Sequence, residues 1–351
     1  METKHSYGFG IIGLGSIAVT HAQAIAKAKN CTLVSGYHAN QDRAEKFCME
    51  YGIKAYSDLD QFLSDPNLDV VVVATPSGMH LEATLAAIKH HKHVIVEKPL
   101  EVTTLRCDQI IEAARREGVK VEGIFQSRYY GAAKVLKKAI DEGRFGKITL
   151  MDAQFKWFRS QAYYDSGAWR GTWQYDGGGV FMNQGIHAVD LLQWFGGAVS
   201  EVSGSIATLT HERIEVEDTA VATLRFANGA LGIIEGTTGS YPGFLKRIEI
   251  CGSLGSAILE EDSLLAWKFL EEQEEDSSIR EQFGKKNGSN IDASKPSGLD
   301  PSGHCTLFEN FALALETGSE PDISGEEAKK SVRIIEAIYK SAKERRQISL
   351  S

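Results

Sequence analysis

The sequence has little of what marks secreted, membrane-spanning or nucleic-acid-binding proteins. Its five cysteines are scattered and form no CxxC pair, so neither a zinc ribbon nor a disulfide framework is indicated, and a reducing cytoplasm is expected. No hydrophobic run approaches the roughly 20 residues of a membrane helix. The net charge is -9 and no segment concentrates basic residues, which argues against nucleic acid as a partner.

The remaining composition is that of a folded protein with more than one domain. The chain has 351 residues, of which 42% are hydrophobic and 24% charged. These values are typical of globular proteins, and the length favours two domains over one.

Apolar runs alternate with helical patterns in the first half of the chain. Residues 9–12, 33–37, 69–75, 93–97 and 119–125 have the composition of buried strands. The segments between them have helical periodicity. This alternation predicts a doubly wound parallel sheet, covered on both faces.

A glycine-rich turn lies between the first strand and the first helix. Gly13-Leu14-Gly15-Ser16-Ile17-Ala18 has the pattern G-x-G-x-x-A. The glycines permit a tight turn and close approach of a pyrophosphate, and the N-terminus of the helix offers backbone donors to it. We therefore expect a dinucleotide site over Gly13, Gly15, Ser16 and Ile17.

The end of the second strand bears on the choice between NAD and NADP. An NAD site usually has a carboxylate there to bind the ribose hydroxyls, whereas this chain has His38, followed by Arg43. The missing carboxylate removes one barrier to a 2′-phosphate, but neutral His38 could also bond a ribose hydroxyl. Both cofactors are therefore expected to bind.

Two more strands deliver polar residues to the edge of the sheet where ligands bind in such folds. Residues 69–75 lead into Pro76, and the strand 93–97 delivers Lys98. A lysine at this edge is a candidate functional residue. His90, His91 and His93 have no spacing that specifies a metal site and fit a solvated helix end, so no metal is expected.

The second half predicts a mainly antiparallel sheet with helices on one side. Strands are expected near residues 148–158, 199–209, 218–226, 230–236, 247–251, 256–260 and 263–267, and helices at 132–142, 304–316 and 325–345. Residues 271–303 have the composition of an exposed loop. Apolar residues on both faces of the strands 218–226 and 230–236 predict a homodimer or homotetramer.

Residues 177–190 combine three glycines with polar residues at helical spacing. Asn183 and His187 stand four apart and would share one face of a helix, with Asp190 nearby. One interpretation is an acid/base site, and the other is a core histidine bonded to its helix neighbours. Before this segment, Tyr163, Trp169 and Arg170 belong to an aromatic loop that fits either stacking on a sugar or nicotinamide, or a hydrophobic flap.

Four motifs in this order resemble the glucose–fructose oxidoreductase / inositol dehydrogenase (Gfo/Idh/MocA) family. They are the glycine turn with His21 after it, Thr75-Pro76 with His80, Glu97-Lys98-Pro99, and residues 177–190. The resemblance implies a Rossmann domain, here 1–126, and a substrate-binding and oligomerisation domain with an open sheet, here 127–351. It also implies NAD or NADP and a sugar, polyol or sugar nucleotide as substrate.

The family resemblance also implies roles for individual residues. Lys98 would lie between nicotinamide and substrate, and His187 would be the acid/base, with Asn183 beside it. Substrate contacts are expected from Lys98, Arg128, Tyr163, Asn183 and His187. Cofactor contacts are expected from Gly13, Gly15, Ser16, Ile17, His38, Arg43, Ala74, Thr75, Pro76, His80, Glu97, Lys98, Gln126, Trp169 and Arg170.

Asn183 departs from the family pattern, since many polyol dehydrogenases have aspartate there. Asparagine cannot take a proton, so the proton chemistry is expected to fall to His187 and Lys98. Because a carboxylate at this position suits the same chemistry, Asn183→Asp is expected to retain activity.

The activity expected is hydride transfer between a nicotinamide and a secondary alcohol or ketone of a sugar-like substrate. The alternatives are an NADPH-dependent sugar ketone reductase, a non-catalytic dinucleotide sensor on the same fold, and an isomerase or glycosidase that uses bound NAD transiently. A sensor would not need both Lys98 and His187.

Overall fold

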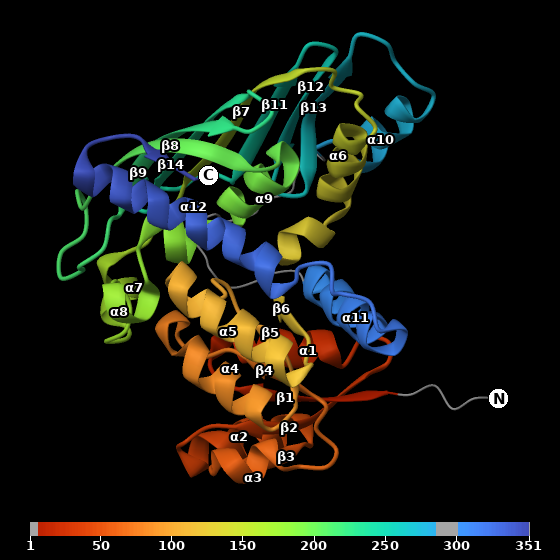
Figure 1. Cartoon of the computed structure of the whole chain (residues 1–351), viewed down its shortest axis with the longest axis vertical. Helices are drawn as coiled ribbons and strands as arrows, with labels where there is room; N and C mark the ends of the chain where they lie inside the picture. Colours follow the sequence, from red (N-terminus) through yellow and green to blue (C-terminus); the bar gives the residue numbers. More distant parts are fainter. Residues whose placement is uncertain (1–5, 286–300, 351) are drawn as a thin grey trace. The chain divides into compact units, whose positions relative to one another are not determined.

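The computed structural model describes residues 6–285 and 301–350 and divides the chain into two compact units (Figure 1). Unit 1 takes in Met1–Gln126 and Leu299–Lys329, and unit 2 takes in Ser127–Gly298 and Lys330–Ser351. Of the described residues, 301–329 cluster with the N-terminal unit, whereas the sequence analysis assigned all of 127–351 to the second domain. The helix in this segment returns to unit 1 because its apolar side packs on the first sheet.

Unit 1 is built on a six-stranded parallel sheet in the order β3-β2-β1-β4-β5-β6. Its centre is fully buried: the four valines of β4 are inaccessible to solvent, which explains their uninterrupted apolar run. The strands are β1 (Tyr7–Ile12), β2 (Cys31–Tyr37), β3 (Lys54–Tyr56), β4 (Val70–Val73), β5 (His93–Val96) and β6 (Val121–Gly123).

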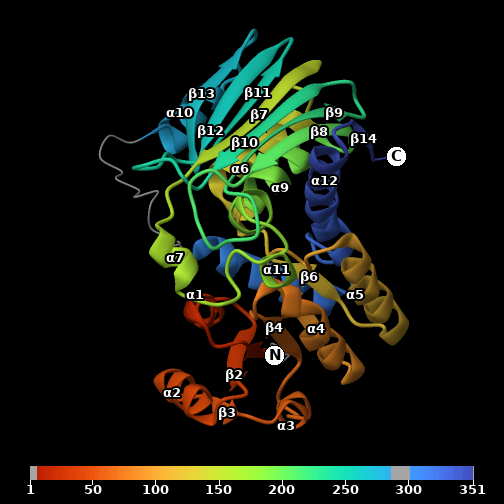
Figure 2. The same ribbon diagram turned by 90° about the vertical axis from the view of Figure 1, so that its left-hand side faces the viewer.

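Helices cover both faces of this sheet, as the alternating pattern predicted (Figure 2). α1 and α11 pack together on one face, and α4 and α5 pack together on the other. The helices of unit 1 are α1 (Ser16–Ile25), α2 (Gln41–Tyr51), α3 (Leu59–Leu63), α4 (His80–Lys89), α5 (Thr104–Glu117) and α11 (Ser302–Thr317), with the 3₁₀ turns η1 (Ser77–Met79) and η2 (Gln126–Tyr129), the second of which begins at the last residue of the segment 1–126.

Unit 2 contains an eight-stranded sheet in the order β13-β12-β11-β7-β10-β9-β8-β14. All neighbours are antiparallel except β7 and β10, which run parallel, so the sheet is mixed and mostly antiparallel. The strands are β7 (Ile148–Lys156), β8 (Val199–Ala207), β9 (Thr219–Phe226), β10 (Leu231–Thr237), β11 (Arg247–Gly252), β12 (Gly255–Glu260), β13 (Ser263–Phe269) and β14 (Ile348–Ser349).

Three helices cover one face of this sheet: α6 (Gly131–Asp141), α9 (Ile186–Gly196) and α12 (Gly325–Glu344), whose residues from Lys330 onward belong to unit 2. Among the described residues no helix covers the other face. Burial alternates along β9, with Ala220, Ala222 and Leu224 facing the helices. No helix within residues 6–285 and 301–350 has the length and apolarity to cross a bilayer.

The prediction of an exposed loop over residues 271–303 is wrong at Glu275–Phe283, which form helix α10. Buried Asp276 explains this: its carboxylate accepts hydrogen bonds from Trp267 and from the Gln273 amide, and it pairs with Arg144. These long-range partners favour a helix where the local composition indicated none. Residues 286–300 of the same expected loop lie outside the described part of the chain.

Candidate active site

The glycine turn after β1 is shaped by contact with the neighbouring strand end. Gly13 has φ +93°, and a Cβ there would lie 2.7 Å from the Ala74 carbonyl carbon, so only glycine fits. By contrast, a Cβ at Gly15 would meet no atom within 4 Å. Gly15 is the N-cap residue of α1. The turn therefore leaves room and backbone donors for an anionic group at Ser16 and Ile17.

His38 and Arg43 lie beyond the end of β2. The Nδ1 atom of His38 accepts a hydrogen bond from the Asn40 amide at 2.9 Å, so the ring proton of the neutral form is on Nε2. Burial, and then the charge of Arg43, lowers the pKa of His38. Neutral His38 thus presents a donor suited to a ribose hydroxyl, and Arg43 in the first turn of α2 is exposed.

Two buried polar atoms lie just after strands β4 and β6, which flank β5 in this sheet. The Thr75 hydroxyl follows β4, and the Gln126 carbonyl Oε1 follows β6; neither has a hydrogen-bond partner among the described residues. Buried polar groups normally have partners. Unsatisfied atoms at the carboxyl edge of a Rossmann sheet fit the place where a dinucleotide binds.

His80 connects the loops after β4 and β5. It is buried, with Nδ1 2.9 Å from the Pro99 carbonyl oxygen and Nε2 3.0 Å from the Thr75 carbonyl oxygen. Both ring nitrogens are therefore directed at the protein's own backbone. The structure gives His80 the role of fixing the Thr75-Pro76 loop beside Lys98-Pro99, so any effect on the cofactor acts through these loops.

Glu97 is also directed into unit 1. One carboxylate oxygen lies 2.9 Å from His21 Nε2, and the other accepts the Lys98 amide hydrogen at 2.9 Å. The His304 ring packs against His21 at 5.3 Å between centroids. Lys98 itself is half-buried, directly after β5. The buried carboxylate thus fixes the backbone that carries the candidate catalytic lysine.

Charge and hydrogen bonding keep Glu97 ionised. Burial alone would raise the pKa of its carboxyl, but the hydrogen bond from His21 and the charges of His21, His304 and Lys98 outweigh burial and lower the pKa to about 2. Glu97 is therefore a permanent anion at working pH.

The ligand atoms of His21, Glu97 and His304 all lie within 4.8 Å of one another, which raises the possibility of a metal centre. The 2.9 Å between His21 and Glu97 is a hydrogen-bond distance, however. Two ligands of one tetrahedral zinc ion would stand about 3.3 Å apart, given bonds of roughly 2 Å. The geometry favours a hydrogen-bonded network.

In unit 2, the segment expected to be one helix is interrupted. Val180–Gln184 form a π-helical turn, η3, and α9 begins after Gly185. Asn183 therefore lies in the π turn and His187 in the first turn of α9, and the expectation that they share one face of a continuous helix is wrong. π turns of this kind occur frequently at functional sites.

Glu217 fixes the start of the π turn. Its carboxylate, which is buried, accepts the amide hydrogens of Gly179 and Phe181 at 2.9 and 3.0 Å and the Tyr339 hydroxyl at 2.8 Å. A Cβ at Gly179 would lie only 1.8 Å from the Glu217 carbonyl oxygen, so this close approach requires glycine. Glu217 therefore anchors the start of the π turn from a distant position in the chain.

The aromatic loop lies beside Asn183. Helix α7 (Gln161–Asp165) carries Tyr163, and the Arg170 guanidinium lies between the rings of Tyr163 and Trp169, at 4.4 and 4.3 Å from their centroids. Gln184 donates to the Tyr163 hydroxyl at 2.9 Å and to the Asn183 side-chain oxygen at 2.8 Å. The structure thus brings Tyr163, Arg170 and Asn183 into one polar network.

Arg128, expected to contact substrate, has a different partner. It forms a buried ion pair with Asp190, with nitrogen–oxygen distances of 2.8 and 2.6 Å, and Ser331 also bonds Asp190. Two buried charges that neutralise each other are costly to separate. The structure therefore gives Arg128 and Asp190 a part in the stability of unit 2, and the substrate contact of Arg128 stays a prediction.

Sequence reasoning missed the carboxylates that hold the site, namely Asp176 and Glu217. Glu217 lies more than 30 residues from the turn that it binds, so no local pattern could reveal it. Asp176 stands immediately before the three glycines, and this adjacency was an available signal. Lys98 belongs to unit 1 and His187 to unit 2, so their cooperation stays a prediction.

A parallel doubly wound sheet, a glycine turn after its first strand and a lysine at its ligand-binding edge define a Rossmann-fold dehydrogenase. Residues 7–124 match the model of the oxidoreductase family with an NAD-binding Rossmann fold, and residues 133–258 match the GFO/IDH/MocA C-terminal domain. The chain belongs to the GFO/IDH/MocA family and is an NAD(P)-dependent oxidoreductase. The predicted fold and family are thereby confirmed.

Several relatives are similar over most of their length. The WlbA dehydrogenase from Bordetella pertussis, solved in complex with NADH and UDP-GlcNAcA, is 33% identical with a TM-score of 0.89, over 100% of this chain and 99% of that one. The myo-inositol 2-dehydrogenase of Thermotoga maritima is 28% identical over 97% of this chain and 98% of its own. The scyllo-inositol 2-dehydrogenase (NAD(+)) of Bacillus subtilis is 29% identical over 73% and 74%.

The lowered pKa of Glu97 predicts a pH-dependent loss of stability in Glu97→Gln. A pKa lowered from 4.5 to about 2 corresponds to roughly 3 kcal/mol at neutral pH. Because the folded pKa lies below the unfolded one, this contribution is fully present above about pH 5 and is lost as the pH falls towards 2. Urea unfolding of both proteins across this range measures the difference.

Glu82→Gln is the matched control, because Glu82 forms an exposed ion pair with Arg106. It should cost less than about 1 kcal/mol. A Glu97→Gln protein as stable as wild type at pH 7, or one whose deficit does not shrink in acid, would contradict the assignment.

Proposed function

We propose that the protein catalyses NAD-dependent oxidation of a secondary hydroxyl on the sugar ring of a sugar nucleotide. The observation that carries this proposal is the full-length similarity to WlbA, a dehydrogenase solved with NADH and a UDP-sugar acid. The identity to the inositol dehydrogenases is lower. Asn183 supports the same choice, since it stands where many polyol dehydrogenases of the family carry aspartate.

We assign the proton transfer to His187 and the stabilisation of negative charge on the substrate oxygen to Lys98. A bound nicotinamide supplies the hydride acceptor. Lys98, fixed at its backbone by Glu97, supplies a positive charge that stabilises alkoxide character on the substrate oxygen. His187, in the first turn of α9, is assigned the role of accepting the hydroxyl proton.

The remaining expected residues are assigned to binding. Asn183 orients the substrate hydroxyl without exchanging protons, and Tyr163 extends this surface. Trp169 and Arg170, stacked on each other, border the nicotinamide end of the cofactor. In unit 1 the contacts are expected from the glycine turn and from the loop Ala74-Thr75-Pro76.

An absorbance screen for reduced nicotinamide tests the function directly. NAD and NADP are each mixed with UDP-sugars, UDP-sugar acids, monosaccharides and inositols. UDP-sugars should give the highest kcat/KM. Turnover with inositols alone would replace the sugar-nucleotide assignment by a polyol dehydrogenase, and bound cofactor without net reduction on any substrate would contradict the proposal.

The assigned roles predict strong effects at two positions. Lys98→Ala and His187→Ala should each lower kcat by roughly a hundredfold or more, the scale of an acid/base group. His187→Ala should leave the cofactor Kd nearly unchanged, because His187 is assigned to the substrate hydroxyl and not to the cofactor. Steady-state kinetics and cofactor titration check both points; near-normal turnover in a folded His187→Ala protein would place the base elsewhere.

Cofactor preference is predicted to depend on His38. Wild type should bind both NAD and NADP, because no carboxylate repels the 2′-phosphate. His38→Asp should weaken NADP binding by like-charge repulsion and retain NAD binding. Fluorescence titration measures both constants. Exclusion of NADP by wild type beyond about a hundredfold, roughly 2.7 kcal/mol, would show that His38 does not permit the phosphate.

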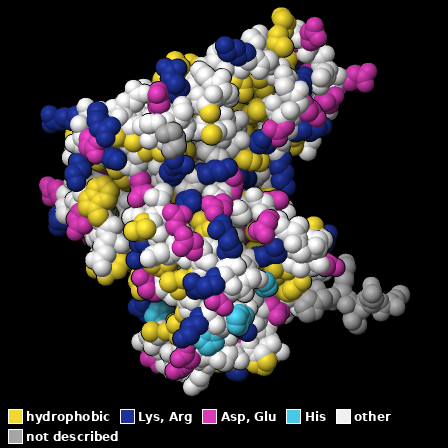
Figure 3. All heavy atoms as spheres, in the orientation of Figure 1, with side chains coloured by type: hydrophobic (Ala, Val, Ile, Leu, Met, Phe, Trp, Pro, Cys, Tyr) yellow, Lys and Arg dark blue, Asp and Glu magenta, His cyan; other side chains and the backbone are white. Residues whose placement is uncertain are grey.

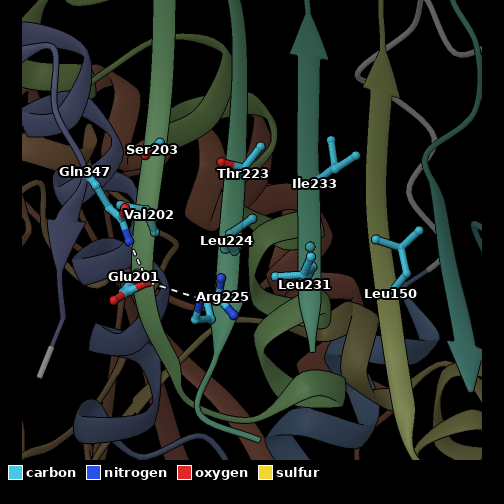
Figure 4. A pocket seen from close by; sticks show the side chains of 11 residues that line it. Leu150, Glu201, Val202, Ser203, Thr223, Leu224, Arg225, Leu231, Ile233 and Gln347 are labelled. Atoms are coloured by element: carbon cyan, nitrogen blue, oxygen red, sulfur yellow. Dashed lines mark hydrogen bonds and ion pairs between the residues drawn. The ribbon is translucent and has the colours of Figure 1, made fainter. Parts of the chain in front are cut away.

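We also propose that the open face of the unit 2 sheet joins two copies of this chain. Figure 4 shows a groove on this face with Leu150, Leu231 and Ile233 on neighbouring strands, beside the ion pair of Glu201 and Arg225. Ile233 is 42% exposed and Leu231 47%. Exposed apolar residues on neighbouring strands are typical of a protein–protein interface, and a two-fold axis would pair this patch with the same patch of a second copy.

Acidic and basic side chains are interspersed over the face drawn in Figure 3 and are not gathered into one basic patch. This distribution gives no support to nucleic acid as a partner at this face.

Oligomeric state is predicted to depend on this face. Wild type should be a dimer or tetramer at micromolar concentration, and Ile233→Lys should dissociate it by burying an uncompensated charge. Met49→Lys, at an exposed methionine of α2, is the control and should leave the assembly intact. Light scattering that shows a wild-type monomer would rule out the interface.

A further inference from the structure

Asn183 takes part in a hydrogen-bonded chain that runs in one direction. Arg159 Nε donates to Gln184 Oε1 at 3.0 Å, and Gln184 Nε2 donates to Asn183 Oδ1 at 2.8 Å. Asn183 Nδ2 then donates to the Asp176 carboxylate. Each amide accepts on its oxygen and donates from its nitrogen, so the bonds reinforce one another.

The two ends of this chain fix its direction. A guanidinium can only donate and an ionised carboxylate can only accept. The Gln184 oxygen must therefore face Arg159, and the Asn183 nitrogen must face Asp176. An isolated asparagine could present either end of its amide to a ligand, but this one cannot turn without breaking two bonds.

Asp176 is built into the fold as an anchor. It is the last residue of α8 (Trp173–Asp176), and its side chain is buried at 3% exposure. Its second oxygen accepts the Gly171 amide hydrogen at 2.6 Å. One carboxylate thus joins the loop before α8 to the π turn that carries Asn183.

We propose that Asp176 is a positioning residue for the reaction: its carboxylate orients the Asn183 amide and so decides which atom of Asn183 meets the substrate hydroxyl. This rests on the proposed function for the role of Asn183. The negative charge that many family members carry at position 183 is here one residue further from the substrate, on Asp176.

The arrangement changes the expectation for Asn183→Asp. On the sequence alone this substitution was expected to retain activity. In the structure, the new carboxylate would face Asp176 at hydrogen-bond distance, with no donor between them. Two carboxylates in contact share one proton, which raises the pKa of one of them. Asn183→Asp should therefore lose activity as the pH rises and the shared proton departs.

Exchanging the two side chains gives a sharp test. In Asp176→Asn/Asn183→Asp, the amide at 176 can accept from the Gly171 amide hydrogen and donate to the carboxylate at 183. Gln184 can still donate to position 183. Every hydrogen bond of the chain is thus possible in the double variant. In Asp176→Asn alone, the new amide nitrogen must face either the Gly171 N–H or the Asn183 side-chain nitrogen, and both of these are donors.

The experiment measures kcat, KM and their pH dependence for wild type, both single variants and the double variant. Asp176→Asn should lower kcat by about tenfold to a hundredfold through misplaced substrate. Asn183→Asp should show a new loss of kcat towards high pH. The double variant should recover kcat to within about threefold of wild type and lack the new limb.

Glu215→Gln is the matched control, since exposed Glu215 accepts the Trp173 amide hydrogen at the start of the same short helix. It should leave kcat and the pH profile unchanged. Thermal unfolding of the four proteins supplies a readout that needs no substrate, and the single variants should lose stability that the double variant regains.

Two results would overturn the proposal. One is an Asp176→Asn protein with wild-type kcat, and the other is a double variant no better than the product of the single effects in both kcat and stability. Failure of the proposed function would give a different result. The wild-type protein would then be inactive on every sugar, while thermal unfolding would still show that the double variant regains the stability lost in the single variants.

Discussion

Buried carboxylates hold the segments that carry the candidate reactive side chains, and the rest of the site depends on them. Glu97 binds the amide of Lys98, Glu217 binds the amides that open the π turn, and Asp176 binds the Asn183 side chain. A buried carboxylate is costly unless several donors satisfy it. The hydrogen bonds that satisfy these carboxylates also fix the backbone of the site and the orientation of the Asn183 amide.

This dependence explains why the two units contribute in different ways. Unit 1 offers a rigid parallel sheet whose edge positions a glycine turn, an unsatisfied threonine hydroxyl and a lysine. Unit 2 offers an interrupted helix and an aromatic loop joined by side-chain hydrogen bonds. The first unit suits a cofactor common to the whole family, and the second suits substrates that differ among its members.

The sequence predicted the fold because the determinants of the first unit are local. The continuous valine run, the G-x-G-x-x-A turn and the helical spacing of its neighbours all lie within short windows, and each has one favoured structure. The helix α10 and the π turn were missed for the opposite reason. Both depend on partners distant in the sequence, Arg144 for Asp276 and Glu217 for Gly179. Likewise, nothing near Arg128 indicated that Asp190 would neutralise it.

In the proposed mechanism, Lys98, His187 and Asn183 act on one substrate hydroxyl. The most direct measurement is a crystal structure of the protein with NAD and the sugar nucleotide that it turns over most efficiently. The account predicts one ring hydroxyl within about 2.6–3.2 Å of Lys98 Nζ, a His187 ring nitrogen and the Asn183 amide, with its carbon against the nicotinamide. A sugar ring whose hydroxyls contact neither Lys98 nor His187 would contradict it.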